Sequence, residues 1–258
     1  MSSIPQKKRA GARAGLTRGA VLATAIGLAD RDGLEALTMR RLGEELGVEA
    51  MSIYGHVSNK NDLLNGMMDA VFAEIALPSR SEKWRSAIRG RSISFYEVLR
   101  KHRWAVSLKD SGTNPGTGTL AQVDQVLGTF LNAGFSLELT AHAISAIDSY
   151  VYGFAMQEKS MPFTTEEETA AMAQIMLAQL PSAEFPHLAN FTANHVLKPG
   201  YFYGDEFIFG LEILLDGLER AWGEQPIRLI ASSSLSAHSA FTARPTQSES
   251  ALAPKPSP

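Results

Sequence analysis

The stretch Leu37–Leu64 reads LTMRRLGEELGVEAMSIYGHVSNKNDLL and decides the fold. Its pattern predicts a short helix capped by Thr38, a turn at Gly47 and a second, very short helix over 50–55. Two short helices joined by a glycine turn form a helix-turn-helix unit, which can place the start of its second helix in a DNA major groove. A segment this short is unstable alone, so neighbouring helices must bury its apolar face.

The chain outside this unit also has helical spacing of its apolar residues, so we predict an all-α fold. We find no strand pattern with a period of two and no internal repeat. Ser58 or Asn59 is expected to cap the helix that joins the unit to a larger helical body, and Asp205 to cap the last helix. The predicted helices cover about 17–31, 38–46, 50–55, 60–76, 82–100, 120–133, 136–158, 165–180 and 205–222, with an irregular, proline-containing connection over 181–204.

The composition is that of an ordinary soluble globular protein, with 258 residues, 45% hydrophobic and 20% charged. The absence of cysteine excludes disulfides and thiolate metal sites and fits a reducing cytoplasm. No apolar run approaches the roughly 18 residues that span a bilayer. Basic residues before Val21–Ala29 imitate a secretory signal, but the helical spacing there indicates an amphipathic helix. We therefore expect a cytoplasmic protein with no membrane partner.

The two ends of the chain differ from its middle in charge and complexity. Although the net charge is −3, the chain carries Lys7, Lys8, Arg9, Arg13 and Arg18 before its first acidic residue. Such an arm can follow a phosphate backbone, but a solvated, flexible segment over 1–14 is the simpler interpretation. Ser, Ala, Pro and Thr dominate 224–258, which predicts a disordered tail.

Residues 36–64, ALTMRRLGEELGVEAMSIYGHVSNKNDLL, resemble the DNA-binding domain of TetR-family transcriptional repressors, and the likeness covers about 17–64. NAGFSLELTAHAISAIDSYVYGFAMQE (132–158) and FIFGLEILLDGLE (207–219) resemble the core of the tetracycline-repressor branch. The resemblance implies a three-helix DNA-binding domain over 15–62 and an effector-binding and dimerisation domain over 63–223.

The predicted DNA contacts surround the second helix of the unit. The resemblance places Arg40 at a base contact, where a guanidinium can bind guanine in bidentate fashion. Small residues at the start of the second helix allow close approach, and Met51 can touch a thymine methyl. The resemblance also places Tyr54, His56 and Lys60 at positions where family residues hold the phosphate backbone. The full predicted set is Thr38, Arg40, Ala50, Met51, Ser52, Tyr54, His56 and Lys60, with Leu42, Leu46, Val48, Ile53 and Val57 assigned to the core.

A dimer is expected because one such unit binds DNA weakly, whereas two read a palindrome. Gly210 and Gly217 lie seven residues apart on the last predicted helix, and small residues allow helices to approach closely. The resemblance assigns this helix and that at 137–157 to a four-helix dimer interface, while a monomer core is the alternative. The predicted interface residues are Ile144, Gly210, Leu211, Leu214, Gly217 and Leu218.

The effector site is predicted in the helical body, where many large apolar groups gather. Phe95 matches an aromatic residue that lines the drug site of tetracycline repressors. The histidine that helps to bind the drug's magnesium appears as Asp110, and polar residues that hold the drug appear as Ala76 and Arg91. We therefore expect an apolar or aromatic effector rather than tetracycline, no cofactor, and no obligatory metal, although Asp110 could help to hold magnesium. The predicted set, which we expect to be mostly plain core, is Phe95, Trp104, Asp110, Thr113, Pro115, Phe130, Ile147, Val151 and Phe154.

These features predict a ligand-responsive repressor that binds a palindromic operator as a homodimer and leaves it when a small effector binds. The alternatives are an enzyme with a pocket in a helical bundle and a helical scaffold for protein partners. His142 and Asp148 lie on one predicted helix, roughly 240° apart around its axis, so they do not converge into a catalytic pair. The sequence leaves open the operator, the effector and the controlled genes, and whether the effector causes release or promotes binding.

Overall fold

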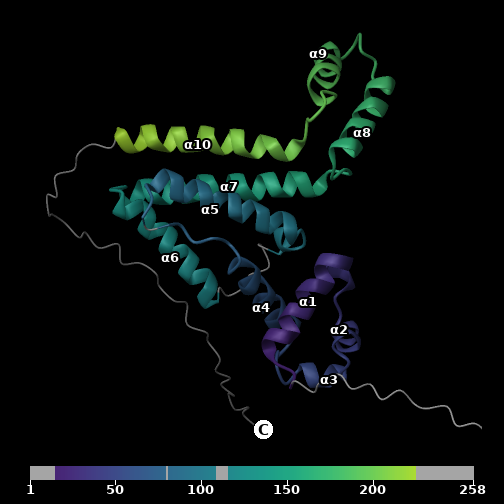
Figure 1. The fold of residues 1–258 in the computed structure, drawn as a ribbon, viewed down its shortest axis with the longest axis vertical. Coiled ribbons are helices and arrows are strands. Elements are labelled where there is room, and N and C mark those ends of the chain that lie inside the picture. Colours follow the sequence, from purple (N-terminus) through teal and green to yellow (C-terminus); the bar gives the residue numbers. More distant parts are fainter. Residues whose placement is uncertain (1–14, 80, 109–115, 225–258) are drawn as a thin grey trace, which may run out of the picture. The chain divides into compact units, whose positions relative to one another are not determined.

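The computed structural model describes residues 15–79, 81–108 and 116–224. Every regular element in these ranges is helical, and none is a strand, as an all-α fold requires. Figure 1 shows the chain as a set of helices joined by short connections. The predicted arm over 1–14, the tail beyond Glu224, and the effector residues Asp110, Thr113 and Pro115 lie outside the described residues.

The amino-terminal helices begin at the predicted residues. The side chain of Thr17 accepts a hydrogen bond from the Ala20 N–H at 3.2 Å, and Thr38 does the same for Arg41 at 3.2 Å. Gly47 ends its helix in the left-handed conformation with φ of 68°, and Asn59 rather than Ser58 caps the next helix. These helices are α1 (Arg18–Asp32), α2 (Met39–Leu46), α3 (Ala50–Ile53) and α4 (Lys60–Phe72).

Five longer helices build the body. They are α5 (Trp84–Lys101), α6 (Thr117–Asn132), α7 (Leu137–Ser160), α8 (Glu166–Gln179) and α10 (Glu206–Gly223). Helix α5 packs against α6, α7 and α10, and α7 packs against α10. In Figure 1, α7 and α10 run side by side above α4, which also packs against α1 and α6. Helix α4 therefore contacts both the short amino-terminal helices and the body.

Three local predictions were wrong. The connection 181–204 is not wholly irregular, because Pro186 begins a short helix, α9 (Pro186–Phe191), and a single π turn follows it. Asp205 lies in a 3₁₀ turn and makes no side-chain cap to α10. Helix α4 ends at Phe72, several residues before the predicted end.

Helix α6 turns a different face to the core than its apolar residues suggest. Leu120 and Val123 are 54% and 49% exposed, whereas Gln122 is buried. The Gln122 side chain donates a 2.6 Å hydrogen bond to the Ile75 carbonyl just after α4. That bond pairs a backbone carbonyl beyond the last turn of α4 and favours this rotation of α6.

Within the described ranges, no helix combines the length and the apolar character that crossing a membrane requires.

Candidate nucleic-acid interface

Helix α3 is supported from one side and open on the other. Leu42, Ile53 and Val57 are at most 1% exposed and belong to the hydrophobic core, as predicted. Met51, at the first turn of the same helix, is 77% exposed, and the neighbouring Ser52 is also exposed. The core therefore fixes the orientation of α3 and leaves its leading edge free to contact another molecule. Leu46 and Val48 are only half-buried but pack against the core.

Helices α2 and α3 approach closely at Gly43, which the sequence analysis did not single out. A Cβ atom at this position would lie 2.9 Å from the Val48 carbonyl oxygen and 3.3 Å from the Ala50 nitrogen. Both are backbone atoms that no side-chain rotation can move. The lack of a side chain at Gly43 therefore sets the distance between the two helices. A glycine in the middle of a short helix, where it lowers helix propensity, was the signal for this role.

The two arginines of α2 have different roles. The Arg40 side chain is 88% exposed, and its ion pair with Glu44 four residues on is 3.5 Å long. Exposed pairs of this kind contribute little free energy, so Arg40 can readily exchange its partner. Arg41 instead donates a 2.6 Å hydrogen bond to Asp32 at the end of α1. Arg40 is thus the α2 arginine that is available for an external contact.

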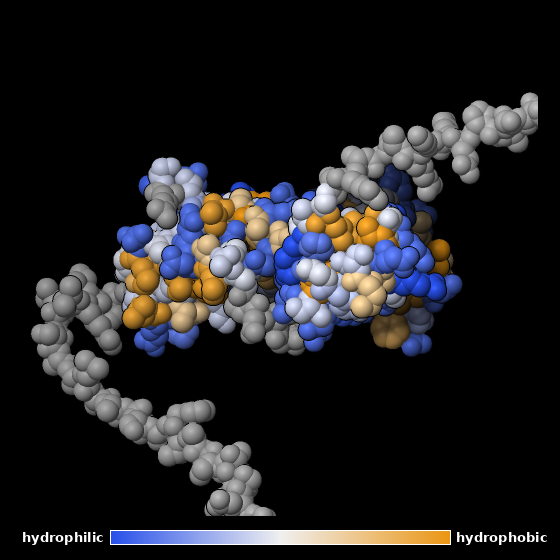
Figure 2. Space-filling model, turned by 90° about the horizontal axis from the view of Figure 1, so that it is seen from below, coloured by the Kyte–Doolittle hydropathy of each residue, from blue (hydrophilic) through white to orange (hydrophobic). Residues whose placement is uncertain are grey.

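The remaining predicted contacts flank α3. Tyr54 is 44% exposed, and Lys60 is exposed at the start of α4. Thr38 is exposed but already caps α2, while Ala50 and His56 are half-buried. Figure 2 views the molecule from the α3 end and shows hydrophilic residues interspersed with separate apolar patches. Exposed cations and a phenol beside a short open helix are groups that suit phosphate contacts.

Arg18 clamps the beginning of this unit to its end. Its guanidinium donates to the His56 carbonyl at 2.9 Å and to both carboxylate oxygens of Asp62 at 2.7 and 3.2 Å. Asp62 also accepts from the Ser58 N–H at 2.8 Å. Although Arg18 ends the basic segment noted in the sequence, it forms this bridge instead of extending the arm. The hydrogen bonds from Arg18 and Ser58 lower the pKa of the Asp62 carboxyl to about 2.

The clamp predicts a pH-dependent difference between the protein and its Asp62→Asn variant. Because the folded pKa of about 2 lies below the ordinary value of 3.8, the carboxylate stabilises the fold above pH 4 and loses that effect as pH falls toward 2. The partly exposed pair contributes about 1 kcal/mol or less. Urea unfolding should show the variant less stable at neutral pH, with the gap closing between pH 4 and 2. A gap independent of pH would contradict this account.

Comparisons with known proteins agree with this geometry. Residues 21–67 match the family model described as bacterial regulatory proteins, tetR family, and residues 77–222 match the model of the tetracyclin repressor-like, C-terminal domain. The chain belongs to the TetR family. As a TetR-family regulator it binds DNA through its amino-terminal domain, and the comparisons support a repressor role.

Individual TetR-family relatives cover most of the chain. An HTH-type transcriptional regulator of Saccharopolyspora erythraea is 35% identical over 69% of this chain and 76% of its own length. The tetracycline repressor protein class C of Escherichia coli is 30% identical over 80% of this chain and 91% of its own. The Streptomyces coelicolor protein ActR, solved in complex with actinorhodin, superposes with a TM-score of 0.67 at 27% identity, covering 82% of this chain and all of its own.

The described members of the predicted effector set do not form one site in this TetR-family body. Each is at most 8% exposed, and they divide among separate aromatic clusters. Phe95 contacts Tyr152 edge-on with ring centres 5.0 Å apart, whereas Phe130 packs on Trp84 at 5.9 Å. The other described members are Trp104, Ile147, Val151 and Phe154.

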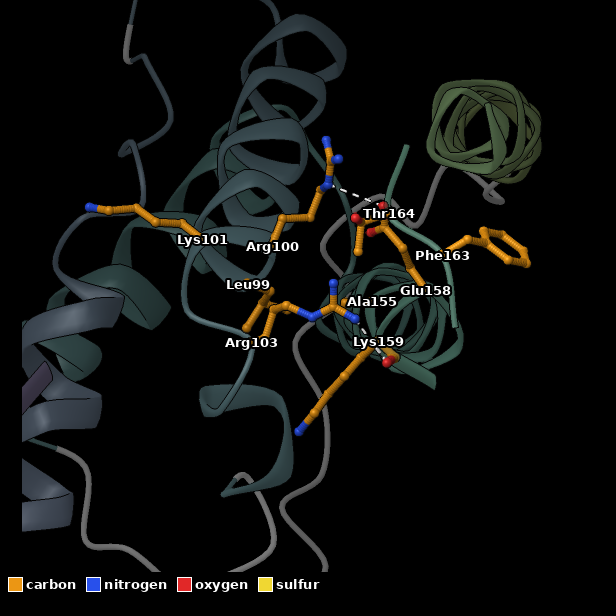
Figure 3. A pocket seen from close by; sticks show the side chains of 9 residues that line it. All are labelled: Leu99, Arg100, Lys101, Arg103, Ala155, Glu158, Lys159, Phe163 and Thr164. Carbon is orange, nitrogen blue, oxygen red and sulfur yellow. Dashed lines mark hydrogen bonds and ion pairs between the residues drawn. The ribbon is translucent and has the colours of Figure 1, made fainter. Parts of the chain in front are cut away.

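Several cavities lie among the described residues, and across the linings of three of them Trp104 is the one residue that belongs to the predicted effector set. The cavity in Figure 3, about 230 Å³, lies between α5 and α7 and is rich in basic side chains. There Arg100 pairs with Glu158 at 3.1 Å, and Arg103 donates to the Lys159 carbonyl at 2.9 Å. A second cavity of about 1010 Å³ is lined by Trp84 and Trp222, and Trp104 lines the third, about 250 Å³.

The predicted dimer residues lie on the expected helices, but several face inward. Leu211 and Leu218 are buried in the protomer core, and a Cβ on Gly210 would meet the Tyr150 hydroxyl of the same chain. These three residues therefore pack the protomer itself, which corrects their assignment to the interface. Ile144 and Leu214 are half-buried, and Gly217 is exposed.

The apolar residues that α10 does expose were not predicted from the sequence. Phe209 is 68% exposed and Ile213 is 56% exposed, one turn apart on α10. On α7, which packs against α10, the exposed residues include Ser149, Gly153 and Met156. Small residues next to large apolar ones allow close helix packing, so this surface, here called the α7–α10 face, suits another helix pair.

Proposed function

We propose that this TetR-family repressor binds a palindromic operator as a homodimer in the cytoplasm and leaves it when a small apolar or aromatic effector binds. In this proposal residues 15–62 bind DNA and residues 63–223 bind the effector and dimerise. The protein acts as a regulator and not as an enzyme. The observation that carries the proposal is the outward leading edge of α3, exposed at Met51 and Ser52 while Ile53 anchors it.

The DNA contacts divide into base and phosphate contacts. Arg40 and Met51 are exposed side chains suited to base edges in the major groove. Tyr54 and Lys60 flank them and would hold the phosphate backbone, which fixes register but carries little sequence information. His56 is half-buried, and Arg18 binds its backbone carbonyl, so its imidazole stays among the proposed phosphate contacts.

The homodimer is proposed to form through the α7–α10 face. Phe209 and Ile213 would be buried against a second copy, and the adjoining small residues of α7 would let the helices come close. Two copies related by a two-fold axis present two α3 helices. Half-sites one or more helical turns of about 34 Å apart are then contacted together.

The switch is proposed to act through α4 and the junction that follows it. Asp69 of α4 accepts hydrogen bonds from the N–H and hydroxyl of Thr119, at 3.0 and 2.9 Å, at the start of α6. The buried His102, just after α5, lies 2.8 Å from Asp30 of α1 and 3.3 Å from Glu74. An effector that alters the packing of the body would therefore also shift α1 and α4. Near-complete release requires about 5.5 kcal/mol of differential affinity.

A gel-shift assay with DNA from upstream of the chain's own coding region tests the function. Salt-dependent binding to a palindrome in that DNA, competed by the same palindrome and not by scrambled DNA, is the expected result. A failure to bind any specific sequence would overturn the repressor proposal.

Arg40→Ala and Lys60→Ala should weaken operator binding in different ways. Loss of a base contact costs about 1–3 kcal/mol and relaxes specificity at one base pair, so Arg40→Ala should bind a point-mutated half-site nearly as well as the natural one. Loss of a phosphate contact weakens all sequences alike and lowers the salt dependence. Fluorescence anisotropy titrations at several salt concentrations separate the two. Identical effects of both variants would contradict the assigned roles.

A further inference from the structure

Arg91 of α5 is a buried cation that neither the DNA contacts nor the α7–α10 face uses. Its side chain is only 9% exposed. Its Nε is fully buried and has no hydrogen-bond partner in the described part of the structure. Burying a guanidinium with an unsatisfied N–H costs free energy that an apolar residue of similar volume would not. Core packing alone therefore does not account for an arginine here.

The charge of Arg91 is only loosely compensated. Its Nη1 lies 3.6 Å from the Asp148 carboxylate, beyond ordinary hydrogen-bond length, and that carboxylate is 35% exposed. Burial lowers the pKa of the Arg91 guanidinium, and the nearby Asp148 partly opposes this. An arginine stays protonated in proteins even so. The site therefore holds a fixed positive charge with a donor to spare at Nε.

The surroundings of Arg91 are aromatic. The guanidinium carbon lies 5.2 Å from the centre of the Phe95 ring. Phe95 in turn meets Tyr152 edge-on at 5.0 Å and Phe72 edge-on at 6.0 Å. These rings come from α4, α5 and α7, and aromatic edges and faces of this kind bury a planar ring well. The Arg91 guanidinium therefore lies against a cluster of aromatic rings.

We propose that Arg91 selects the effector and that the effector is an aromatic acid, whose carboxylate accepts the Nε–H while its ring lies against Phe95 and Tyr152. The flat guanidinium matches a carboxylate in shape and charge, and such charge-assisted hydrogen bonds are stronger than neutral ones. Asp148 remains paired with Nη1 of Arg91. Solvent screens the repulsion between the Asp148 carboxylate and the carboxylate of the ligand. This inference rests on the proposed function, because it supplies the chemistry of the effector assumed there.

The first test measures stability without any ligand. Arg91→Met in the full chain should unfold at the same urea concentration as the natural protein or at a higher one, because it removes a buried, unsatisfied charge. Arg89→Met is the matched control on the same helix, since Arg89 is 42% exposed and its Nε donates to Glu212 at 2.5 Å. A clearly lower midpoint for Arg91→Met would show that Arg91 is needed for folding and would overturn the proposal.

The second test compares acids with their uncharged amides. The probes are benzoate and benzamide, naphthoate and naphthamide, and anthracene carboxylate and its carboxamide, titrated by calorimetry. We expect the natural protein and Arg89→Met to bind at least one acid tenfold or more tightly than its amide, and Arg91→Met to lose that preference. Equal affinity for acid and amide, a preference that survives in Arg91→Met, or no binding of any acid would overturn the inference.

The same protein samples are tested for operator binding. Arg91→Met should bind the operator as the natural protein does, but the preferred acid should release only the natural protein. If the natural protein binds no operator, the repressor proposal fails while the acid preference is still decided by calorimetry. If operator binding is intact and the acid preference is absent, only the role of Arg91 fails.

Discussion

Replacing Gly43 by valine will abolish specific operator binding and lower the stability of the amino-terminal unit, and alanine will do so to a smaller extent. Even a single Cβ here would lie 2.9 Å from the Val48 carbonyl oxygen, and the next nearest atoms also belong to the backbone. Overpacking of this kind costs about 1–3 kcal/mol. Helix α3 must move away from α2, so its exposed edge no longer matches the groove. Urea unfolding and gel shifts on one set of samples measure both effects.

Gly27→Ala is the matched control for Gly43. Gly27 lies within α1, is exposed, and a Cβ there would meet no atom within 4 Å. Because alanine favours helix over glycine, this variant should be as stable as the natural protein or more so, by up to about 1 kcal/mol. Natural operator affinity in Gly43→Ala would show that the close approach of α2 and α3 is not needed.

Placing aspartate at Phe209 and at Ile213 together should convert the protein to a monomer and reduce operator affinity by at least a hundredfold. These side chains are 68% and 56% exposed in the protomer, so the change leaves the protomer core intact. In the proposed dimer they are buried at the centre of the interface, where such residues contribute about 2–4 kcal/mol each. Analytical ultracentrifugation gives the mass, and anisotropy gives the affinity.

Leu120→Asp provides the control for this pair, because Leu120 is 54% exposed on α6, away from the α7–α10 face. It should remain dimeric and bind the operator normally. A double aspartate variant that stays dimeric would show that the dimer interface lies on another surface. A monomer that keeps full operator affinity would instead remove the need for two half-sites.

The elements that the sequence predicted well depend on local chemistry. Thr17, Thr38, Gly47 and Asn59 begin or end helices because their own side chains or backbone angles satisfy helix termini, and these groups are readable from the sequence. The same holds for the core positions of α3, where Ile53 alternates with exposed neighbours. The helix-turn-helix unit was therefore predictable almost completely.

Which side of each long helix is buried was not predictable in this way. Helix α10 is apolar around most of its circumference, so periodicity could not tell the buried Leu211 from the exposed Ile213. The members of the effector set that touch a ligand could not be told from plain core for a related reason, since the packing of large rings depends on helices far apart in the sequence. Arg91 was noted in the sequence as a departure from family residues. Its proposed role in binding the effector rests on its burial and its unpaired Nε, which only the structure shows.

The buried imidazole of His102 connects the amino-terminal helices to the body. It is 1% exposed and lies within hydrogen-bond distance of Asp30 on α1 and of Glu74 just after α4. It therefore connects three segments that are distant in sequence. Trp104 strengthens this connection by donating a 2.6 Å hydrogen bond to Asp30. In the proposed switch, a tilt of α1 would act on the end of α5 directly through these hydrogen bonds. In the proposed switch, binding of operator DNA therefore changes the affinity for the effector by the same factor by which the effector changes the affinity for DNA.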